Sequence, residues 1–441
     1  MANWQKVRIG QFLKEREGRY DPGDESVQRL KRLNKIDFSG EIHLSDKSSK
    51  TDMIIVKPGD LVISGINVSK GALAIYHGEE PIAATIHYSS YIFDKSQIDI
   101  DYFKRFVKSR SFVQALKDQV KGGIKTEIKP KHFLPLEIQL PDIDSQKEIV
   151  SFFMKIENEI NDLSDGITDQ QSFFKQLRQT ILQEAIEGKL TAKWRKQHPD
   201  LISGENHASR LLEKIKAEKE RLTKEGKIKK DKPLAPIADD EKPFELPDGW
   251  MWCRLGKIAN GFQYGSSDKS SKSGEVPVLR MGNLQNGSID WNNLVYTSNK
   301  NEISKYTLIA GDLLFNRTNS RELVGKTAIF TGENAIYAGY LVRFHMADEI
   351  NAYCTNYTMN SGYHRDWCNM VKADALGQSN INATKLRSYV FPLAPIKEQN
   401  AIVERVDKLM AMIDELEKQV TERQEQSEML MQSVLREAFE N

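Results

Sequence analysis

The feature that most constrains this chain is the internal duplication of a long helix-forming segment. Residues 140–187 recur as residues 393–440, in register and without a gap, at an offset of 253 residues. The matching positions include polar pairs such as Gln146 and Gln399, so the similarity is more than a shared hydrophobic periodicity. Because a repeat at a fixed offset determines architecture, we expect two related halves that each end in the same helix.

The duplication extends upstream of the helices, where Gly59-Asp60-Leu61 matches Gly311-Asp312-Leu313 and Trp4 matches Trp250. Between these landmarks the two halves differ almost completely. The predicted fold class is α+β, with two α/β modules separated by two long antiparallel coiled-coil helices in a pseudo-two-fold internal repeat. The predicted divisions are a first module, a first helix, a linker with an amphipathic helix, a second module and a second helix, at residues 1–141, 142–190, 191–246, 247–393 and 394–441.

Apolar residues in both helical segments step by four and three, which is the a/d seam of a heptad repeat. Polar residues interrupt both seams at one level, at Gln170 and from Arg423 onward, which favours a specific pairing of the two helices. Burial of each helix within its own module is the alternative. The residues expected to lie at the helix–helix or partner contact are Ile149, Ile156, Leu163, Ile402, Leu409 and Leu416.

Helices of this length would extend for about 60 Å at ~1.5 Å per residue, which indicates a spacer rather than a domain core. An antiparallel pair would place the modules at opposite ends of the spacer. We therefore expect the linker to return the chain along the helices. It contains an amphipathic stretch with Leu211, Leu212 and Ile215, followed by a basic run from Lys224 to Lys232 that is typical of solvated linker.

Composition describes an ordinary globular chain of 441 residues with 39% hydrophobic and 28% charged residues. No apolar run approaches the ~18–20 residues of a membrane span, and no secretory signal opens the chain, so a cytoplasmic protein is expected. The three cysteines, Cys253, Cys354 and Cys368, lack metal-ligand spacing, and no metal site is predicted. Net charge is only +1, but basic clusters such as Lys104-Arg105 indicate either nucleic-acid contact or a solvated face.

Three motifs carry a resemblance to a known family. They are Pro392-Leu-Ala-Pro-Ile-Lys-Glu-Gln399, Glu187-Gly-Lys-Leu-Thr-Ala-Lys-Trp-Arg195, and the start of the second module, Phe244-Glu-Leu-Pro-Asp-Gly-Trp-Met-Trp-Cys-Arg-Leu-Gly256. Together with the duplication, they resemble the specificity (S) subunits of type I restriction-modification systems, the HsdS family. The resemblance covers essentially the whole chain.

The resemblance implies that each module is a target-recognition domain that reads one half of a bipartite double-stranded DNA site. It also implies that two methyltransferase (modification) subunits dock along the helices, and that restriction (endonuclease and translocase) subunits join them. S-adenosylmethionine, Mg and ATP would then belong to these partners, and no cofactor is expected in this chain.

Catalytic motifs are weak in this sequence. It lacks the catalytic Asn-Pro-Pro or Asp-Pro-Pro motif of methyltransferases, and Gly261-Phe-Gln-Tyr-Gly265 is interpreted as a surface loop rather than a cofactor loop. Glu127-Ile-Lys129 resembles a nuclease string, but its counterpart in the repeat, Asn380-Ile-Asn382, has no carboxylate. The chain is predicted to be non-catalytic. A nuclease using Glu127 and a coiled-coil scaffold that binds only protein are the alternatives.

Candidate DNA-reading residues lie in polar loops of the two modules. Arg and Lys suit guanine, and Asn and Gln suit adenine, although the same side chains also form turns and helix caps. Trp4, Trp250 and Trp252 are expected to be core anchors. The candidate DNA-binding residues are Asn67, Lys70, Lys121 and Lys125 in the first module and Asn316, Arg317, Arg321, Gln378 and Asn380 in the second.

Overall fold

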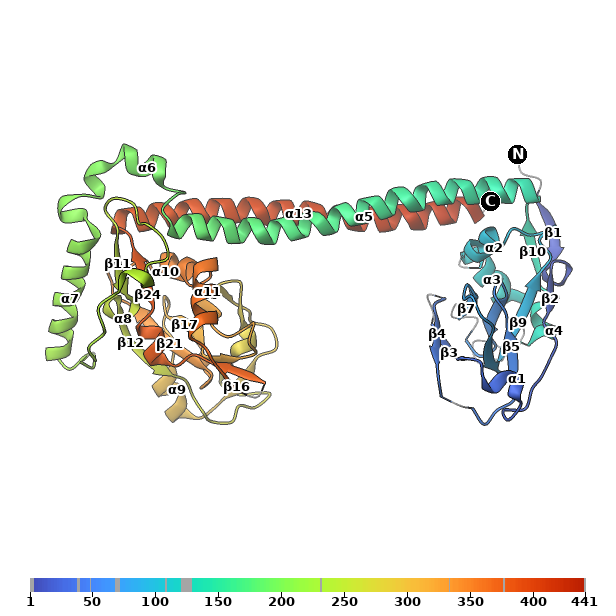
Figure 1. The fold of residues 1–441 in the computed structure, drawn as a ribbon, viewed down its shortest axis with the longest axis horizontal. Helices are drawn as coiled ribbons and strands as arrows, with labels where there is room; N and C mark the ends of the chain where they lie inside the picture. The colour runs from blue at the N-terminus through green and yellow to red at the C-terminus, as the bar shows by residue number, and fades with distance from the viewer. Residues whose placement is uncertain are drawn as a thin grey trace. The chain divides into compact units, whose positions relative to one another are not determined.

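The structure, a computed structural model, divides into two compact units, Met1–Thr168 with Val420–Asn441, and Asp169–Gln419 (Figure 1). It describes residues 4–37, 40–47, 49–67, 72–107, 109–119, 129–230, 232–332, 334–375 and 377–439. Each unit combines one sheet-rich module with parts of both long helices, as the predicted α+β class requires. No helix in this described part of the chain is long and apolar enough to cross a membrane.

In the part that the structure describes, the first module contains three sheets with small helices around them. Its strands are β1 (Gln5–Arg8), β2 (Leu13–Glu15), β3 (Arg32–Ile36), β4 (Ile42–Ser45), β5 (Met53–Val56), β6 (Leu61–Ser64), β7 (Leu73–Ile75), β8 (Ile82–Thr85), β9 (Tyr88–Phe93) and β10 (Glu137–Leu140). Its helices are α1 (Glu25–Gln28), α2 (Ile100–Phe106), α3 (Arg110–Gln119) and α4 (Pro130–Phe133).

The second module repeats this plan with more and shorter strands. Its strands are β11 (Met251–Arg254), β12 (Ala259–Tyr264), β13 (Val276–Leu279), β14 (Leu284–Gln285), β15 (Ser288–Ile289), β16 (Val295–Thr297), β17 (Leu313–Asn316), β18 (Thr318–Asn319), β19 (Thr327–Ile329), β20 (Ile336–Tyr337), β21 (Leu341–Met346), β22 (Ala373–Ala375), β23 (Gln378–Asn380) and β24 (Val390–Leu393). Its helices are α8 (Leu255–Ile258), α9 (Lys300–Tyr306), α10 (Ala352–Thr358), α11 (Gly362–Val371) and α12 (Ala383–Arg387).

Sheet topology shows that the duplication includes the segments whose sequences differ. A four-stranded antiparallel sheet has the order β2-β9-β6-β7 in the first module and β12-β21-β17-β19 in the second. The pair β1–β10 corresponds to β11–β24, and the parallel pair β3–β8 corresponds to β13–β20. The two modules therefore share one fold, which a comparison of residue identities alone does not detect.

The matching glutamines connect each long helix to its module. Gln146 is buried; its side-chain oxygen accepts the N–H of Asp99 at 2.8 Å, and its amide donates to the carbonyl of Pro141 at 2.8 Å. Gln399 does the same with Asn351 and Ala394, at 2.9 and 2.8 Å. Because Asp99 and Asn351 are the N-caps of α2 and α10, one buried amide joins the start of the long helix to the same small helix in both halves.

The long helices are α5 (Ile143–Ile186) and α13 (Ile396–Phe439), and they pair antiparallel within each unit. In the second unit the final turns of α5, with Ile181, pack against the first turns of α13, with Ile402. Arg178 of α5 also forms an ion pair with Asp414 of α13 at 2.5 Å. In the first unit Val150 near the start of α5 shares a cluster with Val434 near the end of α13.

The predicted seam is only partly buried. Ile402 is buried, and Ile149, Ile156 and Leu409 pack against apolar clusters, but Leu163 and Leu416 are 37% and 44% exposed. Leu163 and Leu416 therefore remain partly in solvent, and a contact of these two residues with a partner stays a prediction. Two paired helices cover each other along one narrow strip only. In a straight helix the direction of the seam side chains rotates by ~20° per heptad relative to a 3.5-residue repeat, so the residues at the edge of the strip remain in solvent.

The linker packs on the second module. Its helix α7 (Ala208–Lys224) buries Leu211 and Ile215 in the core of this module, and the Lys219 ammonium donates to the carbonyls of Gly256 and Ala259 at 2.8 and 2.7 Å. The expectation that the linker returns the chain along the helices is wrong. Since α5 itself ends within the second unit, no return is needed before the second module begins.

Candidate nucleic-acid interface

The two polar segments predicted separately in the second module form one surface. Residues after Asn316 and residues after Gly377 were expected to be loops, but they are strands β18 and β23, which pair with each other and with β22. Thr318 lies opposite Asn380 in this small sheet, and the Asn380 amide donates to the Thr318 hydroxyl at 2.7 Å. The small sheet therefore presents Gln378 and Asn380 on a fixed backbone instead of on separate loops.

Arginines at this surface differ in how they are paired. Arg321 is well exposed and lies 3.7 Å from the carboxylate of Asp374 on β22. The Arg317 guanidinium stacks on the Tyr264 ring, with its central carbon 4.6 Å from the ring centroid. Arg317 therefore joins the small sheet to strand β12.

Asn316 does not belong to this surface. Its side chain is 0% exposed, and its amide donates to the carbonyl of Leu323 at 3.4 Å. The prediction that Asn316 offers its amide to DNA is wrong because the residue closes the following turn from inside the module. Its place at the end of a four-residue buried strand explains this, since all of β17 faces protein.

Tyr264 belongs to the same surface as Arg317 but was not among the predicted DNA-binding residues. The segment Gly261–Gly265 was interpreted as a loop, but most of it belongs to strand β12, which pairs with β21 through a bulge. Tyr264 is 42% exposed at the end of this strand, and its oxygen accepts the N–H of Ala383 at 3.1 Å. The alternation of Phe262 and Tyr264 around a single polar residue was the available strand signal.

The first module supplies one described candidate, Asn67, which is half-buried in the turn that follows β6. Its N–H donates to the carbonyl of Ser64 and its carbonyl accepts from Ala72, both at 3.2 Å, so it forms a turn. The candidates Lys70, Lys121 and Lys125 lie outside the described residues, as does Glu127 of the nuclease-like string.

A buried aspartate that pairs with an arginine is also duplicated. Asp60 is buried and accepts from the Arg16 guanidinium at 2.5 and 2.7 Å, which raises the pKa of Arg16. In the second module buried Asp312 pairs with Arg343 at 2.8 Å. Both carboxylates also accept an N–H from the preceding turn, so the matching Gly-Asp-Leu motif fixes the start of strands β6 and β17.

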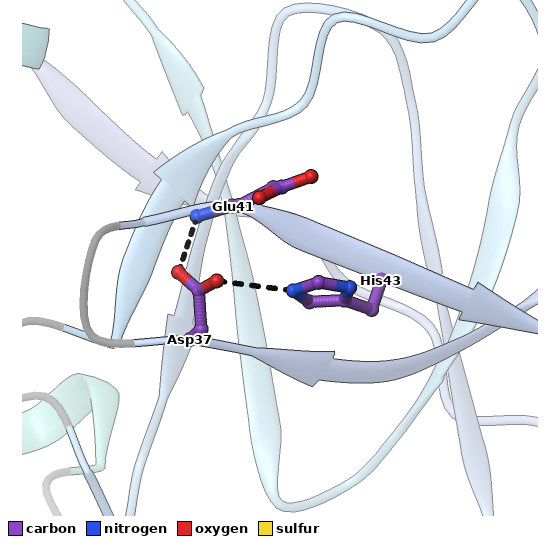
Figure 2. Close-up of side chains that lie close together, drawn as sticks. All are labelled: Asp37, Glu41 and His43. Atoms are coloured by element: carbon purple, nitrogen blue, oxygen red, sulfur yellow. Dashed lines mark hydrogen bonds and ion pairs between the residues drawn. The ribbon is translucent and has the colours of Figure 1, made fainter. Parts of the chain in front are cut away.

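A cluster on the first module has the composition of a metal site. Asp37, Glu41 and His43 meet at the β3–β4 hairpin, with ligand atoms within 4.8 Å of one another (Figure 2). One oxygen of Asp37 accepts the N–H of Glu41 at 2.9 Å, and the other lies 3.0 Å from the His43 ring nitrogen. Both oxygens therefore have partners within the hairpin, and hairpin closure accounts for the cluster.

A cavity of about 600 Å³ in the second unit has the wrong charge for DNA phosphates. Its wall carries four carboxylates and Arg254, which is paired with one of them at 2.7 Å. The carboxylates belong to Glu187, Asp240, Glu241 and Asp366. Phosphate would be repelled from this wall, so the small sheet with Arg317 is the better candidate for nucleic-acid contact.

Comparison with known proteins agrees with this arrangement. Residues 247–426 match the family model described as the type I restriction modification DNA specificity domain. The chain is 31% identical over 278 residues to the EcoEI specificity subunit of Escherichia coli, a match covering 60% of this chain and 45% of that protein. It is 25% identical over 393 residues to the EcoKI specificity subunit of Escherichia coli K12, covering 87% and 75%.

Solved structures share the fold. The HsdS subunit from Thermoanaerobacter tengcongensis has a TM-score of 0.54 at 16% identity, covering 99% of this chain and 96% of that one. A chain from a structure on complex assembly and conformational transition of a type I R-M system has a TM-score of 0.64 at 16% identity, covering 99% and 97%.

The duplicated modules, the paired long helices and these matches define a class of proteins in which two related modules are each joined to two long helices. Residues 247–426 thus carry a type I restriction modification DNA specificity domain, and the chain is similar to the specificity subunits of type I restriction enzymes along most of its length. The match spans less than half of the length of the EcoEI and EcoAI subunits, at 45% and 43%.

Proposed function

We propose that this chain is the non-catalytic DNA sequence-specificity subunit of a type I restriction-modification complex in the cytoplasm. Each module would read one half of a bipartite site. The proposal rests on one observation. Both modules have the same strand topology, but they place different side chains at equivalent backbone positions. Arg317 and Gly65 both follow the central strand directly, and their N–H groups donate to the equivalent carbonyls of Tyr340 and His87, at 3.0 and 2.9 Å.

Shared backbones with different side chains are what two different half-sites require. Base edges specify a sequence, whereas phosphate contacts only position the protein. A common scaffold can therefore place two sets of side chains in the same way on two DNA segments. The helices between the modules would set the distance between the half-sites.

The long helices would also dock the partner subunits. Leu163 and Leu416 are equivalent in the repeat, and both are exposed, as are Leu177 and Leu430. Exposed apolar side chains repeated at matching positions suit two copies of one partner, since each copy would meet the same local surface. The proposed partners are two methyltransferase subunits, with restriction subunits completing the complex; S-adenosylmethionine, Mg and ATP would be bound by these partners.

The chemistry of the buried groups supports a non-catalytic role. Burial raises the pKa of Cys253, Cys354 and Cys368 to about 12, so all three thiols stay protonated and unreactive near neutral pH. Burial also lowers the pKa of His364 to about 4, which keeps this ring neutral. These are properties of core residues rather than of nucleophiles.

The decisive experiment is to purify the chain with its methyltransferase partner and map the methylated bases on mixed-sequence DNA. We expect methylation at one split sequence, and a complex that methylates without sequence preference would contradict the proposal. DNA affinity should also fall steeply with ionic strength, because phosphate contacts release counterions. A protein-only scaffold would show neither behaviour.

A further inference from the structure

We propose that the second module reads a guanine through Arg317, with Tyr264 holding the guanidinium in place. This inference rests on the proposed function, and it adds the identity of one base and of the side chain that reads it. Its basis is the geometry and the pairing of Arg317.

The Arg317 guanidinium has a defined orientation. It lies over the Tyr264 ring at 4.6 Å, and the ring itself is fixed because the tyrosine oxygen accepts the Ala383 N–H at 3.1 Å. A guanidinium over an aromatic face is held electrostatically and keeps its edge free for hydrogen bonds. The stack therefore aims the donors of Arg317 without consuming them.

The backbone at Arg317 is fixed on both sides. Its N–H donates to Tyr340 at 3.0 Å, and its carbonyl accepts from Ile381 at 2.9 Å. The next residue, Thr318, pairs with Asn380 through the sheet and through their side chains. Because little freedom is left to lose on binding, hydrogen bonds made by this side chain cost less entropy than those of a mobile arginine.

Arg317 has a charge that the described residues do not neutralise. Its neighbours Arg321 and Arg343 pair with Asp374 and Asp312, at 3.7 and 2.8 Å, whereas no described carboxylate forms an ion pair with Arg317. Its Nε is buried and has no hydrogen-bond partner among the described residues. The charge of Arg317 is therefore left for an acceptor group of a ligand to balance.

Guanine provides the matching acceptors. Its O6 and N7 atoms lie side by side in the major groove and accept two parallel hydrogen bonds from an arginine fork. The equivalent residue of the first module is Gly65, which has no side chain, so this contact belongs to the second half-site alone. The exposed Tyr340 beside Arg317 adds an aromatic surface at the same point.

The test is R317K in the assembled methyltransferase complex, measured as binding to a panel of duplexes with single base changes across the recognised site. Lysine keeps the charge but loses the fork. We expect preference for a G·C pair at one position of one half-site to fall by about 10- to 100-fold, with the other positions and the salt dependence unchanged. R365K, an exposed arginine on α11 of the same module, is the matched control and should change nothing.

Two tyrosine variants test the role of the stack. They also provide a second measurement of the inference if the arginine variant fails to fold. Y264F keeps the ring but removes the oxygen that accepts the Ala383 N–H, so it should retain part of the G·C preference, whereas Y264L should lose the preference in the same way as R317K. Circular dichroism and tryptophan fluorescence would confirm that each variant is folded.

Three outcomes would overturn the inference. They are a second half-site without a G·C pair, an R317K complex that keeps its full preference, and a uniform loss of affinity on all duplexes, which would indicate a phosphate contact instead. A wild-type complex with no sequence preference would instead contradict the proposed function itself, so the two failures are distinguishable.

Discussion

Glu398 is the residue at which the three motifs of the chain meet. Its carboxylate is 0% exposed and accepts from the Thr191 hydroxyl at 2.6 Å, the Trp250 indole at 2.8 Å and the Arg195 guanidinium. The segment after α5, the start of the second module and the first turn of α13 are thereby joined at one buried charge. The three motifs recognisable in the sequence are therefore parts of one ion-pair network.

We predict that E398A will lower the free energy of unfolding of the second unit by about 3–5 kcal/mol, because it leaves the Arg195 charge buried without its partner. The measurement is urea unfolding of the full chain followed by tryptophan fluorescence. S145A is the control, because Ser145 is equivalent to Glu398 in the repeat. Ser145 donates hydrogen bonds to the Asp142 carboxylate at the exposed start of α5. If S145A lowered the free energy of unfolding as much as E398A does, the stabilising role of the Glu398 network would be contradicted.

His364 makes the stability of the second unit depend on pH. Its pKa is about 4 in the folded chain against 6.5 in the unfolded chain, mainly because of burial, and its Nε2 lies 2.9 Å from the Gly325 carbonyl, to which it donates. As pH falls from about 6.5 to 4, the unfolded chain binds a proton that the folded chain does not, so stability falls by about 3 kcal/mol. Above pH 6.5 the residue contributes no pH dependence.

The check is urea unfolding at pH 7.5 and 4.5 for the wild type and for H364Q. Glutamine can still donate to the Gly325 carbonyl but does not titrate in this range. We therefore expect the drop in stability between the two pH values to be smaller in H364Q by about 3 kcal/mol. Identical drops in both proteins would show that the acid sensitivity arises elsewhere.

At the scale of elements, sequence patterns predicted the helices well and the short strands poorly. The heptads and the motif at Gln399 placed α5 and α13 correctly, because periodicity over ~40 residues is a strong signal. Strands β18 and β23 were interpreted as loops because two or three polar residues carry no reliable alternation, and in β12 Gly261 interrupts the alternation that Phe262 and Tyr264 provide. Asn316, at the end of β17, was predicted to lie at the surface although it is buried, since the burial of a short strand is decided by its neighbours.

The exposed seam residues lead to a prediction about the helices. We expect L163S together with L416S to weaken binding of the methyltransferase subunit by about tenfold or more, because apolar anchors dominate interface energies. Thermal unfolding of the isolated chain should change little, since both side chains are exposed. I413S is the comparison, as Ile413 is buried between the helices and its replacement should destabilise the chain itself. Unchanged partner affinity in the double variant would place docking elsewhere.

At the scale of the whole molecule, the duplication predicted more of the structure than any local motif. It implied that two halves with almost no identity between their landmarks share a fold, and the strand orders β2-β9-β6-β7 and β12-β21-β17-β19 confirm this. The path of the linker was not predictable in the same way. Its helix α7 has an apolar face that could cover either the long helices or a module, and only the packing of Leu211 and Ile215 in the module core decides between them.

The proposed role of the helices as a spacer has a direct consequence for the recognised DNA. Inserting one heptad into α5 and one into α13, at positions that face each other, keeps the seam in phase because seven residues restore the same side chains to the contact. The modules themselves are unchanged, including Arg317 and Tyr264. We therefore expect methylation sequencing to show a longer spacer between two half-sites of unaltered sequence.

The matched control for this insertion is a three-residue insertion in both helices, which shifts the a/d register and should weaken helix pairing and methylation together. If the heptad variant methylated sites with changed half-sites, base reading would have to involve the helices rather than the modules. If it methylated the original site with its original spacer, the helices would not measure the distance between half-sites, and docking of the partner subunits would remain as their function.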